Sequence, residues 1–491
     1  MNTEAAQGRS IGPWGVAFAV SCLVLGGGHR YLGLSHPIDD SGFFFRNAQA
    51  WADQGVFSYS DGATKSFGVS APLWAMLLAC VAEWTGNVVA AGHALAVALY
   101  SLAILVVLAG FRNLRLRMAS VAFLGIALIN PRFWLWTSSG MEVCLGYFLF
   151  ALGFLAVTAP RPRAAWCGAL AALLVIHKLD YAGAALALLI APALGSLERS
   201  SQAGRLRGVL GPLCLALLPF CLLLAFAGFV FEQSFGGLLP NSVGRKLSRE
   251  YGSVSPLWFL RASLLSGSSA VFSLLAALAV WRKAIPLLPS AYCLAHVLSQ
   301  ALAYTLLPPA EPYSWYIAQT QLSLAILAAF GLHSLAVRWG AAGPRRPIGV
   351  GLAIVVPSLA VLLLDRGWFA RMKHWSDTVE RARVAAGQWA CEHLPAQATI
   401  RTSFGLPAFY GKRRTWDTSG LTVRDASRPA WLAEDEGEVY EIDCRFVPIG
   451  QQAPLPEGDP EPIATFKAST ATRYAPDLLD QQDFLVTITR R

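Results

Sequence analysis

The chain has 491 residues, of which 55% are hydrophobic and only 14% are charged. Soluble globular domains carry about 25% charged residues, so this composition excludes that class and indicates an α-helical polytopic membrane protein. The formal net charge of +9 does not indicate nucleic-acid binding, because most Lys and Arg residues stand in short clusters between apolar runs. We therefore expect membrane lipids as partners and no nucleic acid.

Eleven apolar runs in the chain are long enough to cross a membrane as helices, which takes about 17–25 residues each. They are residues 11–30, 87–111, 118–137, 141–159, 166–180, 181–196, 209–231, 259–281, 286–307, 314–337 and 347–364. The first run has no convincing small-residue cleavage site after it, so we expect it to remain as a signal anchor.

Basic clusters occupy every second loop, and the positive-inside rule places those loops in the cytoplasm. The apolar run 71–83 is too short for a span, and a crossing there would put every later basic loop on the wrong side. The sequence therefore predicts a re-entrant or interfacial half-helix at 71–83. It also predicts that the N-terminus is cytoplasmic and the C-terminal region is extracytoplasmic.

The chain becomes polar at residue 365, which divides it into a membrane part (1–364) and a C-terminal domain (365–491). Residues 377–393 have a helical period, and 398–405 and 440–449 are strand-like. We expect a small extracytoplasmic α/β domain. Seven cysteines fall in or beside apolar runs and are expected to be core residues. A disulfide between Cys391 and Cys444 is compatible with the predicted compartment.

The polar stretch 36–74 carries the functional hypothesis. Asp39 and Asp40 open it, and a helix with one amphipathic face follows. Arg46 lies on this face among apolar residues at helical spacing. Two adjacent carboxylates repel, which favours a general base and suits a divalent cation. The alternative is an acidic turn that caps the following helix.

Other candidates lie in the predicted outer turns. Glu142 stands at the start of a span, where a carboxylate is usually functional or paired but also favours the helix dipole. Asp180 has His177 and Lys178 close by, and either could neutralise it. A structural ion pair and a substrate contact are both open for Asp180.

A basic pair also falls on the predicted outer face, where positive charge is depleted. Arg245 and Lys246 follow a turn at Asn241, and such a pair suits a phosphate group or anionic headgroups. Trp315 and Tyr316 open a later span. They fit either an interfacial aromatic belt or stacking on a sugar ring.

Several of these segments together resemble a known family. Six segments are similar, in the same order, to motifs of GT-C fold glycosyltransferases that use polyprenyl-phosphate sugars. They are the run from Asp39-Asp40 to FFFRNAQAWADQG, then SFGVSAPLWAMLLA, SSGME, LLPNSVGRK, SWYIAQ and GLPAFYGKRRTWDTSGLT. The closest resemblance is to the terminal arabinofuranosyltransferases and type IV pilin arabinosyltransferases. HKLDYAG departs from the family's R-P-E-G turn, and residues 66–74 lack its usual glutamate.

The resemblance implies an inverting glycosyl transfer at the bacterial inner membrane, from a polyprenyl-phosphate sugar to an extracytoplasmic glycan or protein. It assigns catalysis to Asp39, as the base, and to Asp40. Substrate binding is expected from Arg46, Glu142, His177, Asp180, Asn241, Arg245, Lys246, Trp315 and Tyr316. No metal site is assigned, although a divalent cation is possible. The alternative is a lipid-linked-sugar flippase or a secondary transporter, whose ionisable residues lie near the bilayer midplane in broken helices.

Overall fold

The structure is a computed structural model of the whole chain. It describes residues 33–60, 65–197, 205–241, 255, 257–282, 286–306, 314–340, 346–418, 438–448, 461–469 and 482–491. The predicted span 11–30 lies outside the described residues. Arg245 and Lys246 also lie outside them.

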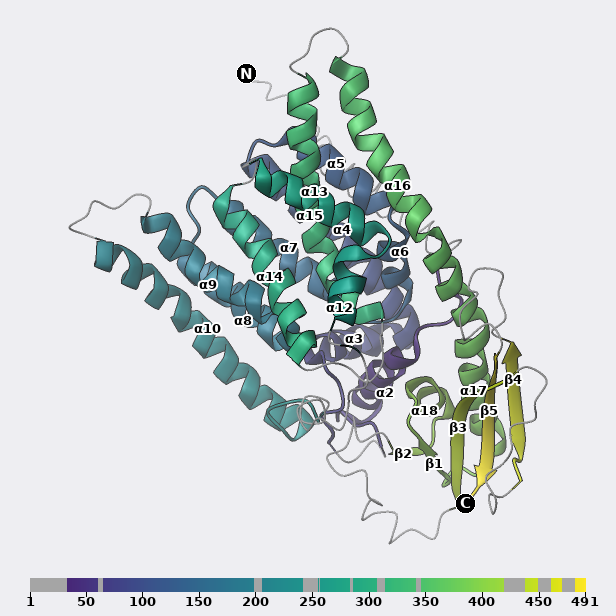
Figure 1. Cartoon of the computed structure of the whole chain (residues 1–491). Coiled ribbons are helices and arrows are strands. Elements are labelled where there is room, and N and C mark those ends of the chain that lie inside the picture. The colour runs from purple at the N-terminus through teal and green to yellow at the C-terminus, as the bar shows by residue number, and fades with distance from the viewer. Residues whose placement is uncertain are drawn as a thin grey trace, which may run out of the picture.

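A bundle of helices forms most of the molecule (Figure 1). All ten apolar runs predicted between residues 87 and 364 are helical. The helices are α4 (Val88–Asn113), α5 (Arg117–Ile129), α6 (Pro131–Ser138), α7 (Val143–Thr158), α8 (Ala164–His177), α9 (Ala182–Leu197), α10 (Arg205–Phe235), α12 (Trp258–Leu260), α13 (Ser268–Trp281), α14 (Leu287–Leu306), α15 (Ser314–Gly340) and α16 (Arg346–Trp375).

Two of the predicted spans are broken rather than straight. Helices α5 and α6 meet at a bend of 57°, where Asn130 caps the amide of Arg132 and Pro131 starts the new helix. The second bend, of 76°, separates α13 from α12 and the π-helical turn η3 (Arg261–Leu265). Gly267 makes this bend with a φ of 52°, a conformation that favours glycine.

Among the described residues, four helices are long and apolar enough to cross a membrane, or six if each bent pair is one span. Three shorter apolar helices accompany them. The molecule is thus a multi-pass helical membrane protein. The predicted count of eleven spans is not confirmed.

Two helices precede the bundle in sequence, α2 (Asp39–Gln54) and α3 (Pro72–Thr85). The predicted half-helix at 71–83 is α3. The amphipathic helix predicted after Asp40 is α2, and its buried face includes Phe43, Phe45 and Asn47. This face contacts α3 and α18 (Gly405–Gly411), so protein rather than lipid covers much of α2.

The C-terminal domain contains the π-helical turn η4 (Ser376–Glu380), helix α17 (Arg381–His393), helix α18 and a sheet. Its five described strands are β1 (Thr399–Thr402), β2 (Arg414–Asp417), β3 (Val439–Pro448), β4 (Ala464–Ser469) and β5 (Gln482–Arg490). Their order is β2-β1-β3-β5-β4, in which β1 is parallel to β2 and β3, and β5 is antiparallel to β3 and β4. The predicted α/β domain is therefore present.

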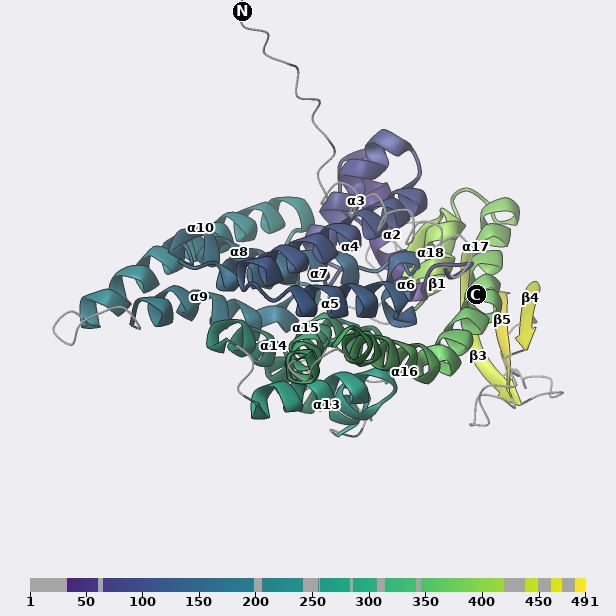
Figure 2. The same cartoon turned by 90° about the horizontal axis from the view of Figure 1, so that it is seen from above.

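Helix α16 joins the two parts without a break at residue 365, as Figures 1 and 2 show. Asp365 is completely buried and pairs with Arg132 of the bundle, so its contacts are with the membrane part. The disulfide considered for Cys391 and Cys444 is not formed, because both thiols are free. The two residues lie on different elements, α17 and β3.

Candidate active site

The site lies at the end of the bundle that carries the C-terminal domain, which we call the domain-proximal end. The turn 139–142 belongs to this end, since the carbonyl of Ser139 accepts a hydrogen bond from the amide of Ile38, next to α2. Ser376 of η4 binds both the amide and the carbonyl of His36 nearby. Chain segments far apart in sequence therefore meet here.

Lys178 is the centre of an ionic cluster at this end. Its Nζ lies 2.7 Å from Glu142 Oε1 and 3.6 Å from Asp180 Oδ2. The Tyr304 hydroxyl donates to Asp180 Oδ2 at 2.6 Å. Both Lys178 and Glu142 are buried, at 6% and 1% exposure. The sequence left open whether Asp180 makes an ion pair, and the structure shows that it does, although Lys178 lies closer to Glu142.

The contact between Lys178 and Glu142 is a buried salt bridge, since 2.7 Å separates Lys178 Nζ from Glu142 Oε1. Each charge compensates the other in a region that water does not reach.

Two further candidates, Tyr316 and Asp40, interact electrostatically with each other, and Tyr316 also interacts with this cluster. The hydroxyl of Tyr316 interacts electrostatically with Asp40, Lys178, Asp180 and Glu142. Tyr304 and Tyr316 also have ring centroids 5.0 Å apart. The direct contacts thus join two carboxylates, one ammonium group and the Tyr304 phenol, and Tyr316 packs beside Tyr304.

Asp39 has a different environment from its neighbour. Its carboxylate accepts backbone hydrogen bonds from Leu406 at 2.9 Å and from Gly405 at 3.3 Å, at the start of α18. Asp39 therefore caps a helix, which is the alternative that the sequence left open. The capped helix is α18, 366 residues away in the sequence, and not α2. Each Asp39 oxygen thus accepts one backbone hydrogen bond.

A buried ion pair lies against Asp39. Glu380 Oε1 accepts from the amide of Asp39 at 3.3 Å, and Glu380 Oε2 pairs with Arg383 at 3.0 Å. Burial is the largest influence on Glu380, and it raises the pKa of Glu380 above its usual value even though Arg383 opposes this shift. This network connects α2 with η4 and α17.

The remaining predicted residues are placed as follows. The guanidinium of Arg46 donates to the carbonyls of residues 59, 60 and 413, at 3.2, 3.3 and 2.7 Å, which fastens α2 to the C-terminal domain. His177 is buried beside Glu142, and neither ring nitrogen has a hydrogen-bond partner among the described residues. The backbone amide of Asn241 donates to the backbone carbonyl of Phe67 at 2.9 Å. Trp315 lies in the first turn of α15, and its side chain is outside the described part.

Sequence reasoning underestimated Lys178 and missed Tyr304. Lys178 was considered only as a neighbour of Asp180, and its shorter contact with Glu142 joins two turns that are 36 residues apart. A signal was available, because a lysine between two apolar helices needs an anionic partner. Tyr304 gave no comparable signal within its apolar run.

Chains of known structure share this arrangement of elements. The crystal structure of ArnT from Cupriavidus metallidurans bound to undecaprenyl phosphate has a TM-score of 0.59 and 14% identity, over 97% of this chain and 98% of that chain. ArnT in the apo state gives 0.57 and 14%, over 87% and 92%. The Archaeoglobus fulgidus oligosaccharyltransferase tethered with an acceptor peptide gives 0.52 and 10%, over 87% and 68%.

The chain has the GT-C fold. At these identities the likenesses establish the fold itself, which the sequence motifs predicted. No protein-family model and no curated protein sequence matches the chain. Within the described part of this GT-C chain, no group of three or more His, Cys, Asp or Glu residues is arranged to hold a metal ion.

Proposed function

We propose that the protein is an inverting glycosyltransferase that moves a sugar from a polyprenyl-phosphate donor to a hydroxyl group of an extracytoplasmic glycan or protein. The observation that carries this proposal is the ionic cluster of Glu142, Lys178 and Asp180 at the domain-proximal end of a GT-C bundle, together with Asp40, whose charge acts on Tyr316 of the same site. The fold adds support, since the ArnT structure of the same fold holds undecaprenyl phosphate.

The reaction needs one proton acceptor and one departing phosphate. A carboxylate takes the proton of the acceptor hydroxyl, and the oxygen forms a bond to the anomeric carbon from the face opposite the phosphate. The bond between that carbon and the phosphate oxygen breaks, and its electron pair leaves with the phosphate. We assign the base to Asp40 rather than Asp39, because the charge of Asp40 acts on Tyr316 at the ionic cluster, whereas the Asp39 carboxylate binds the amides at the start of α18.

The other groups have roles that fit their charges. Glycosyl transfer passes through a transition state with oxocarbenium character, and carboxylates that outnumber the single ammonium group of the cluster stabilise such positive charge. Tyr316 and Trp315 are proposed sugar contacts. Arg245, Lys246 and Asn241 are proposed phosphate ligands, on the sequence motif alone.

The first donor to test is decaprenyl-phosphoryl-arabinofuranose, on the resemblance of the motifs. Purified protein, a radiolabelled form of this donor and a short arabinan acceptor make the assay. Loss of a general base lowers rates by about 10²–10⁴-fold, so Asp40→Asn should lower kcat at least 100-fold with an unchanged Tm. Asp39→Asn is the matched control and should mainly lower Tm.

The outcomes separate the assignments. If Asp40→Asn is active while Asp39→Asn is stable but inactive, the base is Asp39 and not Asp40. A wild type that is inactive with a panel of polyprenyl-phosphate sugars would reject glycosyl transfer. An inactive wild type would favour the transport alternative, because Arg132 and Asp365 lie beside the two helix breaks.

A further inference from the structure

A second polar site lies next to the ionic cluster. It is a cavity of about 180 Å³ between α6, α12, η3, α15 and α16. Its lining residues are Arg132, Trp136, Trp258, Ala262, Ser266, Ile317, Ala318, Gln321 and Trp368. Two of them, Ile317 and Ala318, directly follow Tyr316 on α15, so the cavity and the acidic cluster share one turn of helix.

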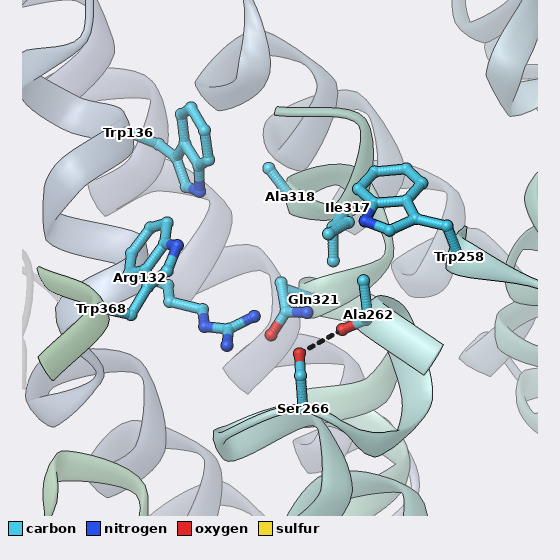
Figure 3. Close-up of a pocket in the computed structure, with 9 residues that line it drawn as sticks. All are labelled: Arg132, Trp136, Trp258, Ala262, Ser266, Ile317, Ala318, Gln321 and Trp368. Atoms are coloured by element: carbon cyan, nitrogen blue, oxygen red, sulfur yellow. Dashed lines mark hydrogen bonds between the residues drawn. The ribbon is translucent and has the colours of Figure 1, made fainter. Parts of the chain in front are cut away.

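The cavity contains polar groups that are held in place by their neighbours. Arg132 pairs with the buried Asp365 at 3.1 Å and stacks on Trp368, 5.1 Å from the ring centroid. Ser269 Oγ accepts from Gln321 at 2.9 Å and from Arg132 at 3.4 Å. Figure 3 shows the guanidinium of Arg132 and the amide of Gln321 directed toward each other.

Three of these buried side chains still have an unsatisfied polar atom. Among the described residues, Arg132 Nε, Trp136 Nε1 and Gln321 Oε1 have no hydrogen-bond partner. The side chains are 7%, 1% and 0% exposed, respectively, and such groups usually find a partner. In Figure 3 the Trp136 nitrogen points toward the space between Ala318 and Arg132. Two donors and one acceptor thus remain for an occupant.

The lining restricts the chemistry of that occupant. Asp365 neutralises Arg132, so the cavity does not select for an anion such as phosphate. Polar groups on the walls disfavour a prenyl chain. Three indoles offer flat faces, and a group with both hydroxyl donors and acceptors beside C–H faces would complete the contacts. A sugar ring has this combination.

The size limits the occupant to one ring. The volume is below the 300–1,000 Å³ of sites for drug-sized ligands, and it suits an occupant with a single ring. We propose that this cavity binds a single monosaccharide unit of one of the two substrates, hydrogen-bonded by Arg132, Trp136 and Gln321. This inference rests on the proposed glycosyl transfer.

The test measures KM for each substrate in variants of the cavity. Trp136→Phe removes one donor and keeps an aromatic ring of smaller size, and Gln321→Leu removes the acceptor. Each lost hydrogen bond should raise one KM about 3-fold to 10-fold. Trp84→Phe is the matched control, because Trp84 is 90% exposed on α3. Ala262→Leu fills the cavity without removing a polar group and should raise the same KM.

Separate KM values for the donor and for the acceptor identify which substrate carries the bound sugar. A higher KM for the donor alone assigns the cavity to the transferred sugar, and a higher KM for the acceptor alone assigns it to the receiving sugar. Unchanged KM values in all three cavity variants, with an active wild type and Tm values within 3 °C of it, would overturn the inference and leave the proposed function standing. An inactive wild type would overturn both.

Discussion

Lys178 decides whether the ionic cluster is stable. The ammonium group is buried and lies between Glu142 and Asp180. Removing one partner of a buried ion pair leaves the other charge without compensation in a region of low polarity. The stability of the site therefore depends on the pair more than on either residue.

We predict that Lys178→Met lowers the free energy of unfolding by about 3–5 kcal/mol, the usual cost of breaking a buried pair. The uncompensated carboxylate of Glu142 is the cause. Thermal unfolding in detergent, followed by tryptophan fluorescence, measures the change.

The double variant Glu142→Gln/Lys178→Met provides the control. It removes the stranded charge, so it should recover part of the lost Tm. A double variant that is no more stable than Lys178→Met would show that Lys178 acts through its packing instead.

At the residue scale, positions at helix ends single out Glu142, Asp180 and Tyr316 in the sequence, but they do not show how the groups pair. The structure joins Glu142 and Asp180 through Lys178. The partner of Asp39 could not be inferred. Leu406 is 367 residues away in sequence, and only the packing of α18 against α2 creates that contact.

At the scale of elements, the contact between α2 and α18 depends on two glycines. A Cβ atom on Gly42 would lie 2.2 Å from the carbonyl carbon of Gly405, and one on Gly405 would lie 2.4 Å from the carbonyl oxygen of Asp39. Both clashes involve backbone atoms, which cannot move as a flexible side chain does. The helices can approach this closely only because neither residue has a side chain.

We predict that Gly42→Ala separates α18 from α2 and lowers Tm by several degrees. The Asp39 carboxylate would lose its bonds to α18, so the amides of Gly405 and Leu406 should exchange faster with deuterium. Hydrogen exchange of a peptide covering residues 405–411 measures this effect.

Gly211→Ala is the matched control, because Gly211 lies in α10 and the added Cβ would point into open space. Alanine also favours a helix over glycine by about 1 kcal/mol, so this variant should be as stable as the wild type or more so. Equal exchange rates in wild type and Gly42→Ala would contradict the role given to this contact.

Periodicity and apolar length predicted the helices well, and local signals explain both breaks. Asn130 followed by Pro131 is a helix start within the run predicted as one straight span. Gly267 marks the second bend in the same way. The angles of 57° and 76° were not predictable, since they depend on how the bent helices pack against α15 and α16.

For the whole molecule, the question is whether the two parts behave as one unit. Independent domain motion is the usual expectation for a small polar interface. Here the interface combines the capped α18, the Glu380–Arg383 pair and an apolar cluster of Phe43, Tyr59 and Ala408. The continuous α16 adds a rigid connection. These contacts favour joint unfolding.

We therefore predict a single unfolding transition for the sheet and the bundle. Hydrogen exchange at increasing temperature can follow β5, at 482–490, and α7, at 143–158, in the same sample. Both segments should lose protection at the same midpoint in the wild type. In Gly42→Ala the midpoint of β5 should fall below that of α7, because the shared contact is lost while each core is intact. Two separate midpoints in the wild type would mean that the interface adds little stability, and that Asp39 shapes the site only locally.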